Sequence, residues 1–158
     1  MNTSTNQQQQ TATPSVAPRE AHQRTGGEKQ NLFADCDVIH SYTRAQAIED
    51  GFLVDLMQNE LGEVCRQHYK HPVACTVAVF EIMRKAVENK KYCNDYAGIL
   101  HDMLHMSQVH WQWLSHASRL FKVIIQGAGR QRVYTFKLVC HAGDSAEPVL
   151  TIMLPNED

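Results

Sequence analysis

Three apolar runs near the end of the chain constrain its fold more than any other feature of the sequence. The runs are FKVIIQ (residues 121–126), VYTFKLVC (133–140) and VLTIML (149–154), and turn-like segments separate them. Their apolar residues alternate with period two or form short continuous stretches, which is typical of β-strands. The sequence therefore predicts a meander of three antiparallel strands at the C-terminal end of the chain.

The segments between residues 44 and 117 carry apolar residues at the three- and four-residue spacing of helices. We expect a short buried strand and four helices there, namely a strand over residues 52–56 and helices over residues 44–50, 58–67, 73–88 and 94–117. Ser41 or Thr43 can cap the first helix and Gly51 can end it, while Gly62 disfavours the second. Helices followed by a meander indicate an α+β fold, with N-terminal helices packed on one face of a small C-terminal antiparallel meander sheet.

The first 30 residues differ from the rest because they hold almost no large apolar side chain. Such a segment cannot bury enough surface to offset the entropy lost on ordering. We therefore expect a disordered polar tail over residues 1–30 and a single domain over residues 31–158. The tail has either no specific role or that of a short docking segment. The chain has no apolar run of about 18 residues and no secretory signal at its start, which indicates a cytoplasmic protein without a membrane partner.

The charged residues are unevenly distributed, although the formal net charge is only −2. That small charge argues against a bulk electrostatic grip on nucleic acid or a membrane. Residues 119–137 hold bases and no acid, whereas residues 141–158 hold acids and no base. These segments either neutralise one another in the fold or form separate charged surfaces, including a basic hairpin tip and an exposed acidic end. The candidate partner-binding residues are Arg119, Lys122, Arg130, Arg132, Lys137, Asn156, Glu157 and Asp158.

Two clusters of histidine and cysteine could bind a metal. The first cluster consists of Cys65, His68, His71 and Cys75. These four residues lie close together, whereas zinc sites use two well-separated pairs that let the chain fold back. The second cluster is His101 and His105, which share a helix face but lack the glutamate of metalloprotease helices and a third ligand. A polar stripe that faces solvent or a partner explains them better, so we expect no metal and no cofactor.

No catalytic constellation emerges from the remaining residues. The cysteines show no regular spacing and are expected to be reduced thiols. Neither a GxSxG motif nor a P-loop is present, and GAGR (residues 127–130) lies between two predicted strands instead of before a helix. Trp111 and Trp113 fall within the longest predicted helix, where core packing accounts for both. The sequence therefore favours a protein that is not an enzyme.

Three stretches together resemble a known family: SYTRAQAIEDGFLVD (residues 41–55), HPVA (71–74) and AGDSAEPVLTIMLPNED (142–158). In order and spacing they are similar to an uncharacterised family, a domain of unknown function, from bacterial plasmids, integrative elements and phages. The resemblance extends over nearly all of residues 35–158, and the closing motif is its most specific part. It implies an accessory protein of a mobile genetic element, and it brings no catalytic or binding residue with it.

These observations favour a non-enzymatic accessory protein that binds a host protein complex, for example as an anti-CRISPR-like or antirestriction-like inhibitor of a defence system. The role of binding a host protein is inferred from the genomic context of such proteins on mobile elements. Two alternatives stay open. One is a nucleic-acid-associated regulator that uses the basic hairpin within residues 119–137, and the other is a metal- or thiol-dependent enzyme.

Overall fold

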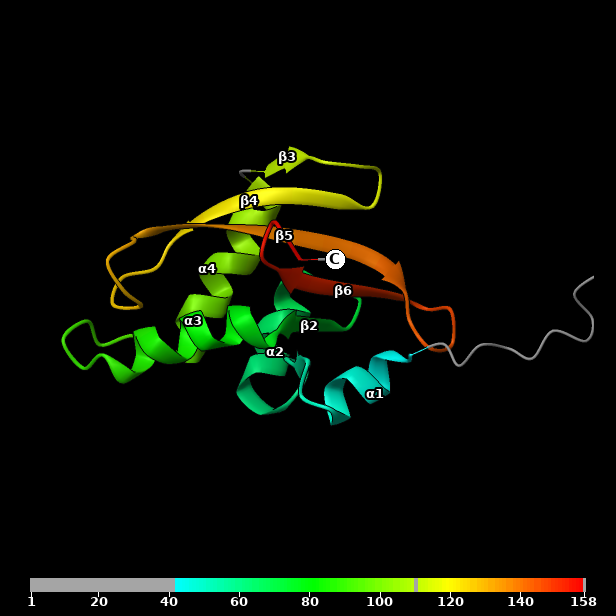
Figure 1. The fold of residues 1–158 in the computed structure, drawn as a ribbon, viewed down its shortest axis with the longest axis horizontal. Helices are drawn as coiled ribbons and strands as arrows, with labels where there is room; N and C mark the ends of the chain where they lie inside the picture. The colour runs from blue at the N-terminus through cyan, green and yellow to red at the C-terminus, as the bar shows by residue number, and fades with distance from the viewer. Residues whose placement is uncertain (1–41, 110, 158) are drawn as a thin grey trace, which may run out of the picture. The chain divides into compact units, whose positions relative to one another are not determined.

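The computed structural model describes residues 42–109 and 111–157, which lie within the compact unit Ile39–Asp158 (Figure 1). The predicted tail, the possible cap Ser41 and residue Cys36 lie outside the described residues. The elements, in chain order, are α1 (Arg44–Glu49), β1 (Leu53–Asp55), α2 (Asn59–His68), β2 (Val73–Thr76), α3 (Val77–Glu88), α4 (Tyr96–Val109), β3 (Trp111–Trp113), β4 (Ser118–Ile124), β5 (Val133–Ala142) and β6 (Pro148–Met153).

The strands form one six-stranded sheet in the order β1-β2-β6-β5-β4-β3. Neighbouring strands are antiparallel except β2 and β6, which run parallel. The predicted α+β class is confirmed, and the predicted meander corresponds to β4, β5 and β6. The sheet is larger than the expected three-stranded meander, because the strand predicted over residues 52–56 joins it as β1 and the strands β2 and β3, which were not predicted, extend it further.

The core lies between this sheet and the helices α2, α3 and α4, which pack on one face of it (Figure 1). Phe121, Phe136 and Ile152 point to that face from β4, β5 and β6, and all three are buried. Residues 149–153 of β6 are buried on both faces, as their apolar character on both sides predicts. None of the helices in the described part of the chain has the length and hydropathy needed to span a bilayer.

Two predicted helices are longer in the prediction than in the structure. The helix expected over residues 94–117 ends at Val109, and Trp111–Trp113 form the edge strand β3 instead. Trp111 pairs with Phe121 and Trp113 with Arg119, so the assignment of both tryptophans to a core helix was wrong. Likewise, residues 73–76 form the buried strand β2 and the helix begins only at Val77. In both cases an apolar pattern compatible with a helix is overridden by pairing with a neighbouring strand.

The first helix begins and ends where the sequence predicts. The Thr43 side chain accepts a hydrogen bond from the Gln46 amide, and the Gln46 side chain accepts one from the Thr43 amide, which completes a capping box. Gly51 follows the helix with a φ of 76°, a left-handed conformation that glycine adopts without steric cost.

Gly62 lies close to the protein backbone at the start of α2. A Cβ atom at this position would lie 2.2 Å from the carbonyl oxygen of Met57, so the glycine that weakens the helix pattern is required by a close backbone approach. We expect Gly62→Ala to lower the free energy of unfolding by about 1–3 kcal/mol, which urea denaturation measures.

Gly98 in α4 is the matched control for this substitution. A Cβ atom there would meet only the Asp95 carboxyl group, at 3.4 Å, which is ordinary contact. Gly98→Ala should therefore be neutral or stabilise by up to about 1 kcal/mol through helix propensity. Equal losses at the two glycines would contradict the contact with Met57.

Candidate functional site

The face of the sheet opposite the helices carries a broad groove with a volume of about 1020 Å³. One side of the groove is formed by Tyr42, which precedes α1, and by Phe52 and Val77, which adjoin β1 and β2. Leu114, in the loop between β3 and β4, lies on the other side. These four large hydrophobic side chains are all exposed, and Phe52 retains 63% of its accessible surface. We call this the open-face groove.

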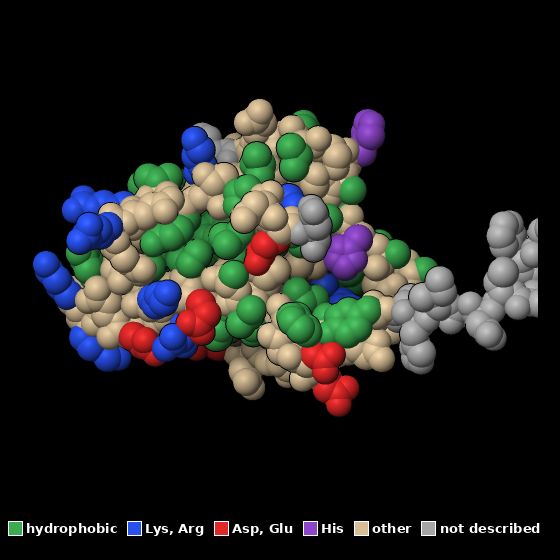
Figure 2. Space-filling view, viewed as in Figure 1, with side chains coloured by type: hydrophobic (Ala, Val, Ile, Leu, Met, Phe, Trp, Pro, Cys, Tyr) green, Lys and Arg blue, Asp and Glu red, His purple; other side chains and the backbone are tan. Residues whose placement is uncertain are grey.

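The floor of the open-face groove is formed by β5 and β6. Lys137 pairs with Met153 and Val139 with Thr151, which puts these residues on the face that α2, α3 and α4 leave uncovered. An antiparallel sheet with one free face usually shows polar residues there. Val139 and Met153 add apolar surface to this floor beside the polar Lys137 and Thr151, and hydrophobic side chains gather on the molecular face around β5 and β6 (Figure 2).

The C-terminal residues close one edge of this floor. The Glu157 carboxylate accepts hydrogen bonds from the Thr76 hydroxyl, at 2.8 Å, and from the Leu154 amide, at 2.6 Å. The backbone carbonyl of Glu157 accepts a hydrogen bond from the Lys137 ammonium group. The expectation that Glu157 belongs to an exposed acidic end was therefore wrong. Asn156 is exposed as expected, and Asp158 lies outside the described residues.

Two motifs far apart in the sequence hold α1 beside the groove. The Asp144 carboxylate accepts hydrogen bonds from the backbone amides of Arg44 and Ala45, at 2.7 and 2.9 Å. These bonds favour the ionised carboxylate and lower the pKa of Asp144. The Arg44 guanidinium donates to the hydroxyl of Thr151, which also bonds to the His141 imidazole. The start and the end of the domain are thereby joined.

The predicted basic segment 119–137 does not form one surface, because alternate residues of a strand point to opposite faces. Arg119 lies on the helix side, where it donates to the Tyr69 hydroxyl at 2.7 Å and sits over the Trp111 ring. Lys137 is buried in the groove floor. The expectation of a single basic hairpin surface therefore fails for these two residues. Lys122, Arg130 and Arg132 are exposed.

The first cysteine and histidine cluster is divided between the core and the surface. Cys65 and Cys75 are fully buried, and burial raises their thiol pKa to about 11 and about 12. His71 is exposed in the loop after α2. Within residues 42–109 and 111–157 no group of three or more His, Cys, Asp or Glu side chains is placed to hold a metal ion. Zinc content measured by elemental analysis remains the test of the no-metal prediction.

The structure brings together three histidines that the sequence assigned to separate clusters. The His68 ring, at the end of α2, lies 4.8 Å from the His101 ring and 6.4 Å from the His105 ring on α4. The Nε2 atom of His68 is buried and has no hydrogen-bond partner. Burial, followed by the two neighbouring imidazoles, lowers the pKa of His68 even though Gln108 bonds nearby. Only the packing of α2 on α4 creates this cluster, so the sequence pattern carries no signal for it.

Glu157 provides a stability prediction. Glu157→Ala removes the acceptor for the Thr76 hydroxyl and the Leu154 amide, so we expect a loss of about 1–3 kcal/mol in the free energy of unfolding. Asn156→Ala, at the exposed neighbouring residue, should stay within about 0.5 kcal/mol of the wild type. Denaturant titration of both variants decides whether the carboxylate is an internal partner.

The histidine cluster predicts a dependence of stability on pH. Because the pKa of His68 is lower in the folded chain than in the unfolded chain, the unfolded chain binds the proton more readily below pH 6.5. The free energy of unfolding should therefore fall as the pH drops below 6.5. His68→Gln should flatten that part of the stability profile, whereas His71→Gln, at an exposed loop position, should preserve it. A profile unchanged by His68→Gln would contradict this account.

Comparison with known proteins places the chain in a family. No curated protein and no solved structure matches it. A family model described as a family of unknown function, DUF6573, matches residues 29–158, a range that contains both of the motifs joined through Arg44 and Asp144. The predicted resemblance to an uncharacterised family is thereby confirmed, and the chain belongs to the DUF6573 family of unknown function.

Proposed function

We propose that this protein is a non-enzymatic binding protein whose open-face groove receives an amphipathic helix of a partner protein. The observation that carries the proposal is the apolar lining of a sheet face that none of α2, α3 and α4 covers. Apolar patches of this kind mark interaction surfaces in proteins that otherwise bury such side chains. The raised thiol pKa of Cys65 and Cys75 also keeps these buried groups protonated, which disfavours a thiol-dependent enzyme that uses them.

The dimensions of the groove support a helix as the occupant. Its two sides lie beside β2 and β4, and β6 and β5 lie between them. Three inter-strand steps of roughly 4.8 Å give a width of about 14 Å. An α-helix with its side chains is about 10–12 Å across, so one helix fits between the sides. Its apolar face would rest on Val139 and Met153, as in other helix-in-groove complexes.

The proposed biological setting is a mobile genetic element. The resemblance of three sequence stretches to proteins of plasmids, integrative elements and phages supports this setting. In it, the partner is a subunit of a host protein complex, and binding inhibits a defence system such as restriction or CRISPR interference. The protein contributes a binding surface and no chemistry of its own.

Groove substitutions test the binding proposal. Phe52→Asp and Leu114→Asp each place a charge on one exposed side of the groove, so both should abolish capture of the partner from a host lysate. Val109→Asp is the matched control, because Val109 is a similarly exposed residue at the end of α4, outside the groove. Circular dichroism establishes that all three variants fold.

The variants that lose capture of the partner protein decide between support and contradiction. A protein captured in equal amounts by the wild type and Val109→Asp, and lost with both groove variants, supports the proposal. Retention by the groove variants, or capture of no protein by the wild type, contradicts it. A plaque assay in a strain with an active defence system tests the setting: expression of the wild type should raise phage plating, and expression of Leu114→Asp should not.

A further inference from the structure

Two loops that are distant in the sequence are fastened together at one end of the sheet. Asn94, in the loop between α3 and α4, donates from its side-chain amide to the Gln126 carbonyl, at 2.7 Å. Asn89 similarly donates to the carbonyl of Gly127, at 3.1 Å. A Cβ atom at Gly127 would lie 2.9 Å from the Tyr92 ring, so the β4–β5 loop packs closely on the α3–α4 loop. The two loops act as one surface.

This surface carries four exposed cations, Lys90 and Lys91 from the α3–α4 loop and Arg130 and Arg132 from the β4–β5 loop. We call it the basic end. Within the described residues, none of the four forms an ion pair with a carboxylate. Figure 2 shows Lys and Arg side chains gathered at the end of the domain where Figure 1 places these two loops.

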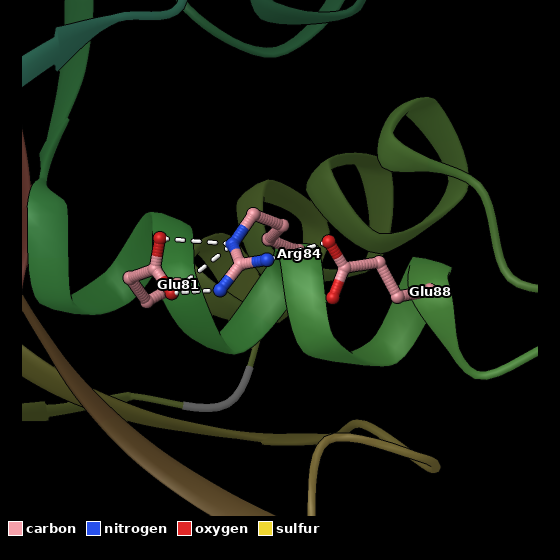
Figure 3. Close-up of polar contacts among 3 residues, drawn as sticks. All are labelled: Glu81, Arg84 and Glu88. Atoms are coloured by element: carbon pink, nitrogen blue, oxygen red, sulfur yellow. Dashed lines mark hydrogen bonds and ion pairs between the residues drawn. The ribbon is translucent and has the colours of Figure 1, made fainter.

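The acidic side chains of α3 are already engaged nearby. Glu81 and Glu88 both pair with Arg84, at 2.7 and 2.5 Å, so that one guanidinium lies between two carboxylates (Figure 3). These bonds lower the pKa of Glu81 and raise that of Arg84. Glu81, Arg84 and Glu88 therefore pair with one another on α3. The cations of the two loops face solvent.

We propose that the basic end binds the phosphate backbone of nucleic acid without reading base sequence. Phosphate contacts come from Arg, Lys, Gln and backbone amides, and residues 126–132, QGAGRQR, consist almost entirely of such groups. Residues 126–132 hold no large apolar or aromatic side chain of the kind that anchors protein interfaces, and the exposed Tyr92, Ile124 and Val133 lie beside this segment. The site is separate from the open-face groove, because none of its four cations lines that groove.

The composition of this site differs from what the sequence predicts for a nucleic-acid-binding hairpin. Arg119 and Lys137 drop out, since one bonds to Tyr69 and the other is buried beside Glu157. Lys90 and Lys91 enter it through the hydrogen bonds of Asn89 and Asn94. A surface formed by two loops can contact several phosphates along a nucleic-acid backbone, whereas a single hairpin tip would contact it at only one point.

Charge reversal tests the proposal with the full chain and a fluorescein-labelled duplex of about 20 base pairs. We prepare Lys90→Glu with Lys91→Glu as one pair, and Arg130→Glu with Arg132→Glu as another. Each pair should weaken binding roughly tenfold at low salt and should reduce the slope of log K against log salt by about 2. Any contribution from residues 1–41 is common to all variants, so the differences report the basic end.

Arg66→Glu with Lys70→Glu is the control pair, because it changes the net charge equally. Gln108 bonds to the His68 carbonyl, which places this region at the C-terminal end of α4, whereas Asn94 precedes the N-terminal end. The 14 residues of α4 span about 21 Å, so the control cations lie away from the basic end. The control pair should change affinity less than about twofold, as expected for cations outside the contact surface.

An uncharged variant tests whether the two loops act together. Asn94→Ala removes the bond to Gln126 without altering any charge, and it should weaken duplex binding while circular dichroism shows a folded protein. Leu114→Asp, in the groove, should bind the duplex as the wild type does, which separates this proposal from the proposed protein partner.

Four results would overturn the proposal. Three of them are no binding of the duplex by the wild type at low salt, an equal loss with the control pair, and poly-glutamate binding as tight as duplex binding. The last result would identify the basic end as a surface for an acidic protein. Binding that depends on one base sequence would contradict a contact made only with the phosphate backbone.

Discussion

The parallel pairing of β2 with β6 is the interaction on which the rest of the structure depends. Val73 lies opposite Leu150 and Cys75 opposite Ile152, so the strand that precedes α3 is joined to the last strand of the chain. The Leu150 amide also donates to the carbonyl of Pro72, at 2.8 Å. Both strands are buried almost completely, as parallel strands in the interior of a sheet usually are. This pairing unites the helical half and the meander in one domain.

One consequence is that the two faces of the sheet differ. The chain between β2 and β4 supplies α3 and α4, which cover one face together with α2. The short helix α1 is held at the border of the other face by Asp144 and Arg44, which leaves β5 and β6 open beside it. The open-face groove therefore follows from the connectivity of the fold. The basic end arises elsewhere, where the loops after α3 and β4 meet.

The sequence predicts the elements whose signals are local. The cap at Thr43, the turn at Gly51 and the three meander strands need only neighbouring residues, and the structure contains all of them. The sequence cannot show which face of the sheet a strand residue takes when both alternating sets of residues carry charge. For that reason Arg119 and Lys137 were assigned to one surface. Nor can the sequence show that Gly62 meets the Met57 carbonyl, because that contact depends on the backbone turn at Asn59, where φ is 49°.

The features that depend on contacts between residues far apart in the chain were missed or misassigned from the sequence. Trp111–Trp113 continue a helical pattern, and only the ladder with β4 makes them a strand. The histidine cluster around His68 and the basic end both need a contact between segments far apart in the chain. The candidate sites depend on these distant contacts. The sequence therefore predicts more of the fold than of the sites.

The most direct test of the central claim, that the open-face groove is the partner surface, is site-specific photo-crosslinking in host cells. A benzophenone amino acid replaces Phe52 in one variant and Val109 in another, both at exposed positions. The account predicts a single crosslinked host protein from position 52 and none from position 109. Crosslinking of that protein from position 109 alone, or of no protein from position 52, would contradict it.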